Sequence, residues 1–288
     1  MEILMYLSIV LASVTQSAST KAYNRGGGSS LVFNALKTLT ALLLFLVITI
    51  PDFTLHGPTV VYGLLYGASL CLSMYAGYRA LGLGPMALTS MLASFSLLMP
   101  LLWGIFGRGE PFGPLKAAGL TLLLVSLLLV NAHSLRPPKA DGNPEKRQGL
   151  WLFFVAVTFL CNGICSILQK EHQTAYPSLY NREFMLFAML LCAAVFTAVA
   201  LIRLPADAWR TAPRKGMGVL SGATNSLANF LTLLLAGMEN ASVLFPIVSA
   251  GTILGALLCG RVVFGEKLRA NQYAALVLGV AAIVLMKL

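Results

Sequence analysis

Charged side chains are scarce in this chain. Asp, Glu, Lys and Arg make up only 10% of its 288 residues, whereas 58% are hydrophobic. A soluble domain of this size cannot hide so much apolar surface, so the composition excludes a soluble globular protein. A membrane-spanning helix needs roughly 20 mostly apolar residues, and ten such runs leave nothing over for a soluble domain. The sequence therefore predicts an all-α membrane protein with ten transmembrane helices.

Carboxylates are missing from the interior of every apolar run. All of the acids lie near expected helix ends or in loops: Glu2, Asp52, Glu110, Asp141, Glu145, Glu171, Glu183, Asp207, Glu239 and Glu266. The three histidines, His56, His133 and His172, are scattered over expected loops. The chain has no Gly-x-x-x-x-Gly-Lys-Ser/Thr phosphate loop, no His-Glu-x-x-His motif and no nucleophile elbow. We therefore expect neither ATP hydrolysis nor a cofactor, and an intramembrane enzyme is kept only as an alternative of another class.

The five cysteines do not indicate a metal site. All of them fall inside apolar runs, and Cys161 and Cys165 lie four residues apart on one helix face. No histidine or carboxylate accompanies this pair at the same depth, as a metal site would require. Small apolar packing is the better interpretation of the cysteines, so we expect no bound metal.

The apolar runs follow a pattern that returns 156 positions later. Gly104 corresponds to Gly260, and Glu110 corresponds to Glu266, each glutamate following a glycine between two apolar runs. A repeated Gly-Glu pair in this setting indicates an internal duplication. Duplication in a membrane chain is typical of transporters.

A polar segment at 136–148, with two prolines and mixed charges, separates the halves and is expected in water. We divide the chain into a first five-helix repeat at 1–133, a hydrophilic linker at 134–148 and a second five-helix repeat at 149–288. Because five is odd, the second repeat must be inverted relative to the first.

Lys and Arg in the loops predict the orientation. Fifteen of them share one side: Lys21, Arg25, Lys37, Arg79, Arg136, Lys139, Lys146, Arg147, Arg203, Arg210, Arg214, Lys215, Arg261, Lys267 and Arg269. Five lie on the other side: Arg108, Lys116, Lys170, Arg182 and Lys287. We expect the protein in a cell (inner) membrane, and this charge bias predicts that both termini lie outside the cytoplasm.

The chain resembles the drug/metabolite transporter superfamily, specifically its EamA-like branch. The phrases that carry the resemblance are Tyr78-Arg79-Ala80-Leu81-Gly82-Leu83-Gly84-Pro85-Met86-Ala87, Leu98-Met99-Pro100-Leu101-Leu102, Phe245-Pro246-Ile247-Val248 and Phe264-Gly265-Glu266-Lys267-Leu268. The resemblance implies a central cavity lined mainly by the first, third, fourth, sixth, eighth and ninth helices. The four-helix multidrug relatives carry a membrane-embedded glutamate in their first helix, where this chain offers Gln16 and no carboxylate.

Polar stripes at repeat-equivalent positions mark four of the helices expected to line that cavity. The asparagines lie at 162 on the sixth helix and at 225 and 229 on the eighth. Residues at i and i+4 share a helix face. We predict that the following residues bind substrate: Asn162, Asn225, Asn229, Ser13, Gln16, Ser17, Ser69, Ser73, Tyr75, Tyr78 and Ser166. The alternative is that the polar residues only join helices to one another, and that Tyr75 and Tyr78 are interface anchors.

Other positions invite a structural or a binding role. Lys37 lies about 10 Å inside its helix at 1.5 Å per residue, and it either extends outward to water or pairs with an anionic group. Glu110 and Glu266 are expected to be structural, each accepting hydrogen bonds from the N–H groups that open the next helix. The pairs Gly63/Gly67 and Gly218/Gly222 predict a close crossing of the third and eighth helices.

These patterns favour a secondary transporter, an exporter or exchanger, that moves a small organic metabolite by alternating access. A multidrug exporter of the same fold is the nearest alternative, and a passive channel would not require two symmetric halves. The expected partners are a small-molecule substrate and the lipid bilayer, with no nucleic acid; a homodimer is left open.

Overall fold

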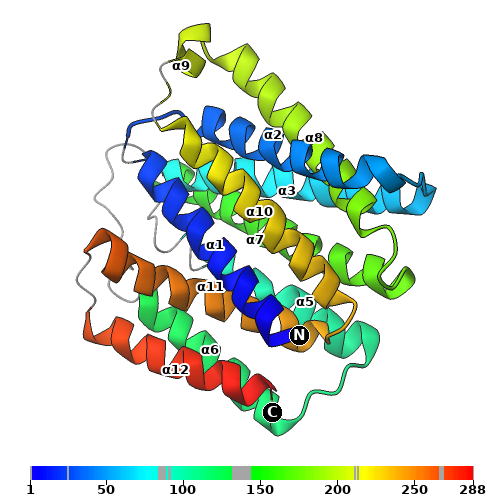
Figure 1. The fold of residues 1–288 in the computed structure, drawn as a ribbon. Coiled ribbons are helices and arrows are strands. Elements are labelled where there is room, and N and C mark those ends of the chain that lie inside the picture. The colour runs from blue at the N-terminus through cyan, green and yellow to red at the C-terminus, as the bar shows by residue number, and fades with distance from the viewer. Residues whose placement is uncertain are drawn as a thin grey trace. The chain divides into compact units, whose positions relative to one another are not determined.

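The computed structural model describes residues 2–24, 26–83, 89, 92–131, 144–210, 212, 214–265 and 269–287. These residues are mostly helical, and no strand occurs among them (Figure 1). The helical elements are α1 (Glu2–Asn24), α2 (Ser30–Thr49), η1 (Ile50–Asp52), α3 (Gly57–Leu83), η2 (Phe95–Leu97), α5 (Leu98–Leu102), η3 (Trp103–Gly107), α6 (Pro114–Asn131), α7 (Pro144–Ala175), α8 (Asn181–Arg203), α9 (Ala206–Arg210), α10 (Lys215–Ala236), α11 (Ala241–Phe264) and α12 (Ala270–Lys287).

Eight helices in the described ranges are long and apolar enough to cross a membrane. They lie at Glu2–Tyr23, Ser30–Asp52, Gly57–Ala80, Gln148–Ala175, Asn181–Arg203, Lys215–Ala236, Ala241–Val263 and Ala270–Lys287. Two shorter apolar helices, Leu92–Gly107 and Pro114–Val130, coincide with the two remaining predicted spans. The prediction of an all-α, multi-pass membrane protein is confirmed, and the count of ten spans stays a prediction.

The helix that follows the linker begins earlier than the sequence predicts. α7 starts at Pro144, so residues 144–148 of the predicted linker at 134–148 are helical. Proline suits the first helical position because its missing N–H would have no partner there. Residues 132–143 lie outside the described ranges. α7 also extends to Ala175, which places His172 inside a helix and corrects its assignment to a loop.

The described chain divides into two compact units. The first comprises residues 1–71, 168–238 and 258–263, and the second comprises 72–167, 239–257 and 264–288. Each unit combines segments from both predicted repeats, since α3 and α7 each contribute one end to each unit.

Helix α10 packs against α1 and α2 in the first unit, and α2 also packs against α8 (Figure 1). Two glycines allow close backbone approach there. A Cβ atom on Gly67 of α3 would lie 2.7 Å from the Ala188 carbonyl oxygen of α8. One on Gly222 of α10 would overlap the Lys37 carbonyl oxygen of α2 and lie 2.7 Å from Thr40 Cβ. These glycines therefore meet α8 and α2 and not each other, which corrects the role predicted for them, whereas α3 and α10 contact each other through Tyr66 and Asn229.

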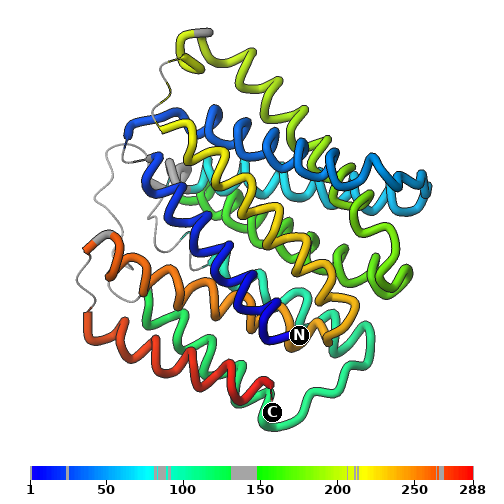
Figure 2. The backbone as a smooth tube through the Cα atoms, viewed as in Figure 1, coloured from blue at the N-terminus to red at the C-terminus, as the bar shows by residue number. Residues whose placement is uncertain are grey.

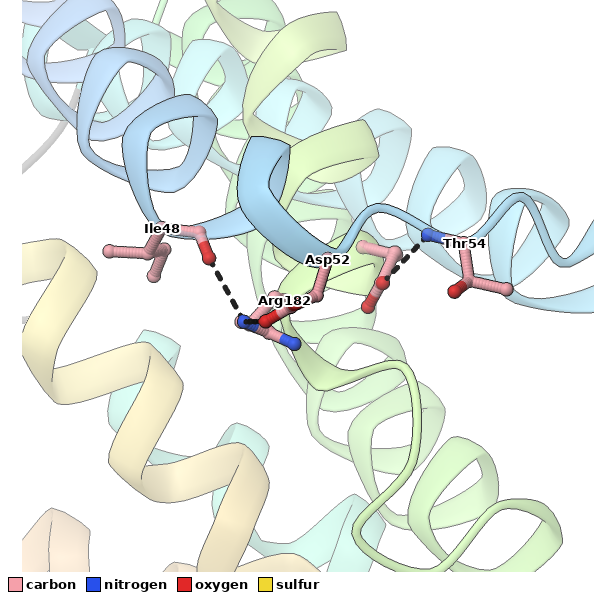
Figure 3. Close-up of polar contacts among 5 residues, drawn as sticks. Ile48, Asp52, Thr54 and Arg182 are labelled. Atoms are coloured by element: carbon pink, nitrogen blue, oxygen red, sulfur yellow. Dashed lines mark hydrogen bonds and ion pairs between the residues drawn. The ribbon is translucent and has the colours of Figure 1, made fainter.

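Arg182 and Glu183, at the start of α8, hold the segment that follows α2. The Arg182 guanidinium donates to the Ile48 carbonyl at 3.1 Å and pairs with Asp52 at 3.2 Å (Figure 3). The Thr54 N–H donates to the Glu183 carboxylate at 3.3 Å. Glu183 is buried, whereas the Arg182–Asp52 pair is exposed and adds little stability. Arg182 thus contacts the end of α2 and η1, and Glu183 contacts Thr54 just after them. Together the two residues connect the segment 48–54 to the start of α8.

The second unit contains an antiparallel pair, α6 and α12, whose paths Figure 2 shows side by side. Gly119 lies against Ala282, where an added Cβ would be 3.0 Å from the carbonyl oxygen. The Ser126 hydroxyl donates to the Ala275 carbonyl at 2.7 Å. From the first contact to the second, the residue number increases along α6 and decreases along α12, so the two helices are antiparallel.

Candidate functional site

Polar side chains of α3, α7 and α10 meet inside the first unit. The Tyr66 hydroxyl donates to Asn229 Oδ1 at 2.8 Å, and Asn229 Nδ2 donates to the Asn225 carbonyl at 2.8 Å. Gln169 Nε2 donates to the Asn229 carbonyl at 3.5 Å. We call Tyr66, Gln169, Asn225 and Asn229 the Asn229 cluster. Lipid offers no hydrogen-bond partners, so such groups must find partners within the protein or in whatever enters it.

Asn225 differs from its neighbour Asn229 in how its side chain is used. Its backbone carbonyl accepts the bond from Asn229, but its side-chain amide makes no hydrogen bond to any residue that the structure describes. The residue keeps only 8% of its surface accessible. An amide has several donor and acceptor sites, which are costly to bury unused. Asn229 is therefore a brace between helices, whereas the Asn225 amide is available to a ligand.

The third predicted asparagine, Asn162, lies on α7 in the second unit. The Ser73 hydroxyl of α3 donates to Asn162 Oδ1 at 2.6 Å. Ser73 is buried and Asn162 is half-buried. The structure thus brings together these two predicted residues from different halves of the chain.

The remaining predicted serines and Gln16 make more local contacts. Ser17 donates to the Ser13 carbonyl at 3.0 Å, and Ser166 donates to the Asn162 carbonyl at 3.4 Å. Both bonds run back to the carbonyl four residues earlier in the same helix, so they connect no second helix. Among the described residues, no hydrogen bond links Ser13, Gln16, Ser17 or Ser69 to the Asn229 cluster.

The predicted aromatic residues Tyr75 and Tyr78 are exposed in the second unit, at 46% and 54%. Tyr75 packs edge-on against Phe154, with ring centroids 6.3 Å apart. The Arg79 guanidinium lies 6.0 Å from the Tyr75 ring and 5.5 Å from the Phe154 ring. The tyrosine therefore belongs to a local cation–π group.

Glu110 caps a helix, but not the one that follows it in sequence. Its two carboxylate oxygens accept the N–H groups of Ala241 and Ser242, each at 2.8 Å, at the start of α11. The prediction of α6 as the capped helix is thereby corrected. Gly104 leaves room for this carboxylate, because an added Cβ would lie 2.5 Å from it. Negative charge at a helix amino terminus is favourable. Glu266 lies outside the described residues.

A histidine pair was missed because its members are far apart in sequence. Thr59 Oγ1 lies 2.9 Å from His56 Nδ1 and 3.1 Å from His172 Nε2. The Gln173 amide lies 3.1 Å from His172 Nδ1, and since that NH₂ group can only donate, the His172 proton lies on Nε2. His56 also stacks on Tyr180 with ring centroids 4.4 Å apart. This network joins the ends of α3, α7 and α8 in the first unit.

Comparison with known proteins supports the architecture. No family model matches the chain, and no curated protein matches it. The chain shares its fold with a solved structure. That structure, described only as "Crystal structure of protein", aligns with a TM-score of 0.79 over 99% of this chain and 95% of its own length. Their sequences are 16% identical, so the likeness concerns the fold alone, and function must be argued from the site.

Proposed function

We propose that this protein is a secondary transporter, an exporter or exchanger of a small organic metabolite, working by alternating access. The observation that carries the proposal is the Asn229 cluster, a set of polar side chains held between apolar helices with the Asn225 amide left available. Polar groups within membrane-spanning helices are costly, and they mark substrate or ion pathways. The resemblance to the EamA-like branch of the drug/metabolite transporter superfamily agrees with this assignment.

Contacts between α6 and α12 support ten spans in two inverted repeats. Gly119 meets Ala282, and Ser126 meets Ala275. Adding the repeat offset gives 119 + 156 = 275 and 126 + 156 = 282, so each contact is the repeat equivalent of the other. A two-fold axis between the helices requires such reciprocity.

The glycine contacts in the first unit support the same arrangement. Gly67 meets Ala188, and Gly222 meets Lys37. The two glycines are 155 positions apart (222 − 67), and their partners are 151 apart (188 − 37). The third helix of one repeat thus contacts the second helix of the other repeat, and the reverse also holds. Symmetry of this kind suits a carrier that exposes one site alternately to each side.

Transport by a carrier can be distinguished from a channel by counterflow. Purified protein in liposomes loaded with an excess of unlabelled candidate metabolite is diluted into a trace of the same labelled compound. A carrier should accumulate label transiently above the external concentration, whereas a channel only equilibrates it. The panel covers amino acids, amines, nucleosides, sugars and phosphorylated metabolites, with protein-free liposomes as the control. Equilibration without any overshoot for compounds that enter would contradict the proposal.

The proposed orientation places 136–148 in the cytoplasm and both termini outside a cell (inner) membrane. A cysteine introduced into that segment, in a chain otherwise free of cysteine, should react with a membrane-impermeant reagent only after the cells are opened. Gly113→Cys, at an exposed position on the opposite predicted side, is the matched control and should react in intact cells. The reverse labelling pattern would invert the orientation.

A further inference from the structure

We infer that the transported molecule carries an anionic group, a carboxylate or a phosphoryl group, and that Lys37 on α2 binds it together with the Asn225 amide. The inference rests on the proposed transport function, because it names the chemical class of that substrate. Two observations support it. The Lys37 charge lies inside an apolar helix, and no described carboxylate neutralises it.

Lys37 lies inside an apolar helix that is long enough to span a membrane, where a charge is costly. α2 begins at Ser30, so Lys37 is about 10 Å along the helix. Arg182 at the start of α8 contacts the Ile48 carbonyl near the end of α2, and the two helices run antiparallel from this contact. Cys192 in α8 therefore lies at about the same level as Lys37 in α2. The Lys37 ammonium is within electrostatic range of the Cys192 thiol, which is fully buried at the middle of α8. An ammonium at this depth needs compensation.

The described residues do not supply a counter-charge. No carboxylate among them pairs with Lys37, and its ammonium forms no hydrogen bond to them. Protein atoms surround the ammonium densely, yet part of the side chain remains accessible. An uncompensated buried charge is strongly unfavourable, whereas a paired and hydrogen-bonded one is tolerated. An anion that enters would provide the missing pairing.

A closed series of contacts connects Lys37 with the Asn229 cluster. The Cys192 thiol near Lys37 donates to the Gly67 carbonyl at 3.4 Å, and Gly67 adjoins Tyr66, which donates to Asn229. On the other side, the Lys37 carbonyl touches α10 at Gly222. Asn225 follows Gly222 by three residues and therefore shares its helix face. The unpaired ammonium and the unbonded amide thus belong to helices in direct contact.

This pair of groups matches an oxyanion. An ammonium supplies charge and up to three N–H donors, and an amide adds two more donors. Carboxylate and phosphoryl oxygens accept several such bonds, and charge-assisted bonds are stronger than neutral ones. A cationic substrate would instead be repelled by Lys37, which separates this inference from the multidrug alternative.

Ligand-induced stabilisation of purified protein in neutral-lipid nanodiscs tests the inference. The probes are matched pairs: lactate with lactamide, glycerol 3-phosphate with glycerol, and inorganic phosphate with an equal ionic strength of chloride. We expect at least one organic anion to raise the melting temperature while its neutral twin does not. The carboxylate and phosphate arms show which anion is preferred, and stabilisation by inorganic phosphate alone would indicate an adventitious ion only and overturn the inference.

Variants of Lys37 connect that binding to the residue. Lys37→Met should weaken the apparent affinity for the anion by about tenfold or more, because a charge-assisted hydrogen bond is lost, and Lys37→Arg should retain part of it. Lys116→Met is the matched control, since Lys116 lies in the second unit and its ammonium donates to the Pro111 carbonyl. If Lys37→Met does not fold, protection of Lys37 from an amine-reactive reagent by the anion gives the same information.

Two outcomes would overturn the inference. One is the absence of any anion-specific effect that depends on Lys37 across the whole panel. The other is counterflow of a neutral or cationic substrate with unchanged kinetics in Lys37→Arg and Lys37→Met. That second result would leave the transport function standing, so the failure of each proposal can be distinguished from the failure of the other.

Discussion

Gly222→Ala should lower the free energy of unfolding by about 1–3 kcal/mol, the usual cost of overpacking a close contact. The added methyl would overlap the Lys37 carbonyl oxygen and lie 2.7 Å from Thr40 Cβ. The first of these atoms is backbone, so relief requires α2 and α10 to separate. Thermal unfolding in one detergent, followed by circular dichroism, measures the loss.

Gly216→Ala is the matched control for this prediction, because Gly216 lies on the same helix with nothing within 4 Å of an added Cβ. Alanine is favoured over glycine in helices by up to about 1 kcal/mol, so this variant should be neutral or more stable. Gly67→Ala, the repeat-related change against Ala188, should resemble Gly222→Ala. Equal effects of Gly216→Ala and Gly222→Ala would show that helix contact is not the cause.

The sequence predicts which positions are special better than it predicts what they contact. The small residues Gly67 and Gly222 were expected to allow close approach, and they do, but against α8 and α2. Glu110 was expected to cap a helix, and it caps α11. Periodicity reports the face on which a residue lies. The element that packs against that face depends on tertiary structure, which the periodicity of a single sequence does not indicate.

The polar stripes illustrate the same limit at the site. Asn225 and Asn229 could be selected because amides are rare inside apolar runs. Tyr66 and Gln169 were missed, although Tyr66 precedes Ser73 by seven residues and Gln169 follows Asn162 by seven, so each shares a predicted stripe. The helical pattern could therefore have identified both. The bond between Tyr66 and Asn229 joins residues 163 positions apart and could not be predicted from spacing.

The second large predicted effect distinguishes two asparagines of α10: Asn225, which we expect to bind substrate, and Asn229, which connects helices. Asn225→Ala should reduce transport by roughly tenfold or more, since a hydrogen bond to a charged ligand group contributes about 1.5–3 kcal/mol. Its stability should change little, because the Asn225 amide bonds to no described residue. Asn229→Ala should mainly lower stability, because it removes the acceptor of Tyr66 and the donor to the Asn225 carbonyl.

Counterflow rates and thermal unfolding, measured on the same preparations, give the two readouts for this comparison. Asn271→Ala is the control amide: Asn271 of α12 donates to the Leu129 carbonyl at 2.7 Å, in the second unit. Its loss should lower stability and leave the apparent affinity for substrate unchanged. If Asn225→Ala lowers stability and leaves the affinity unchanged, as Asn271→Ala should, the Asn225 side chain has only a packing role, and the substrate must bind elsewhere. A loss of affinity confined to Asn225→Ala instead supports the assignment of that amide to the transport site, because bracing alone cannot lower affinity while stability is retained.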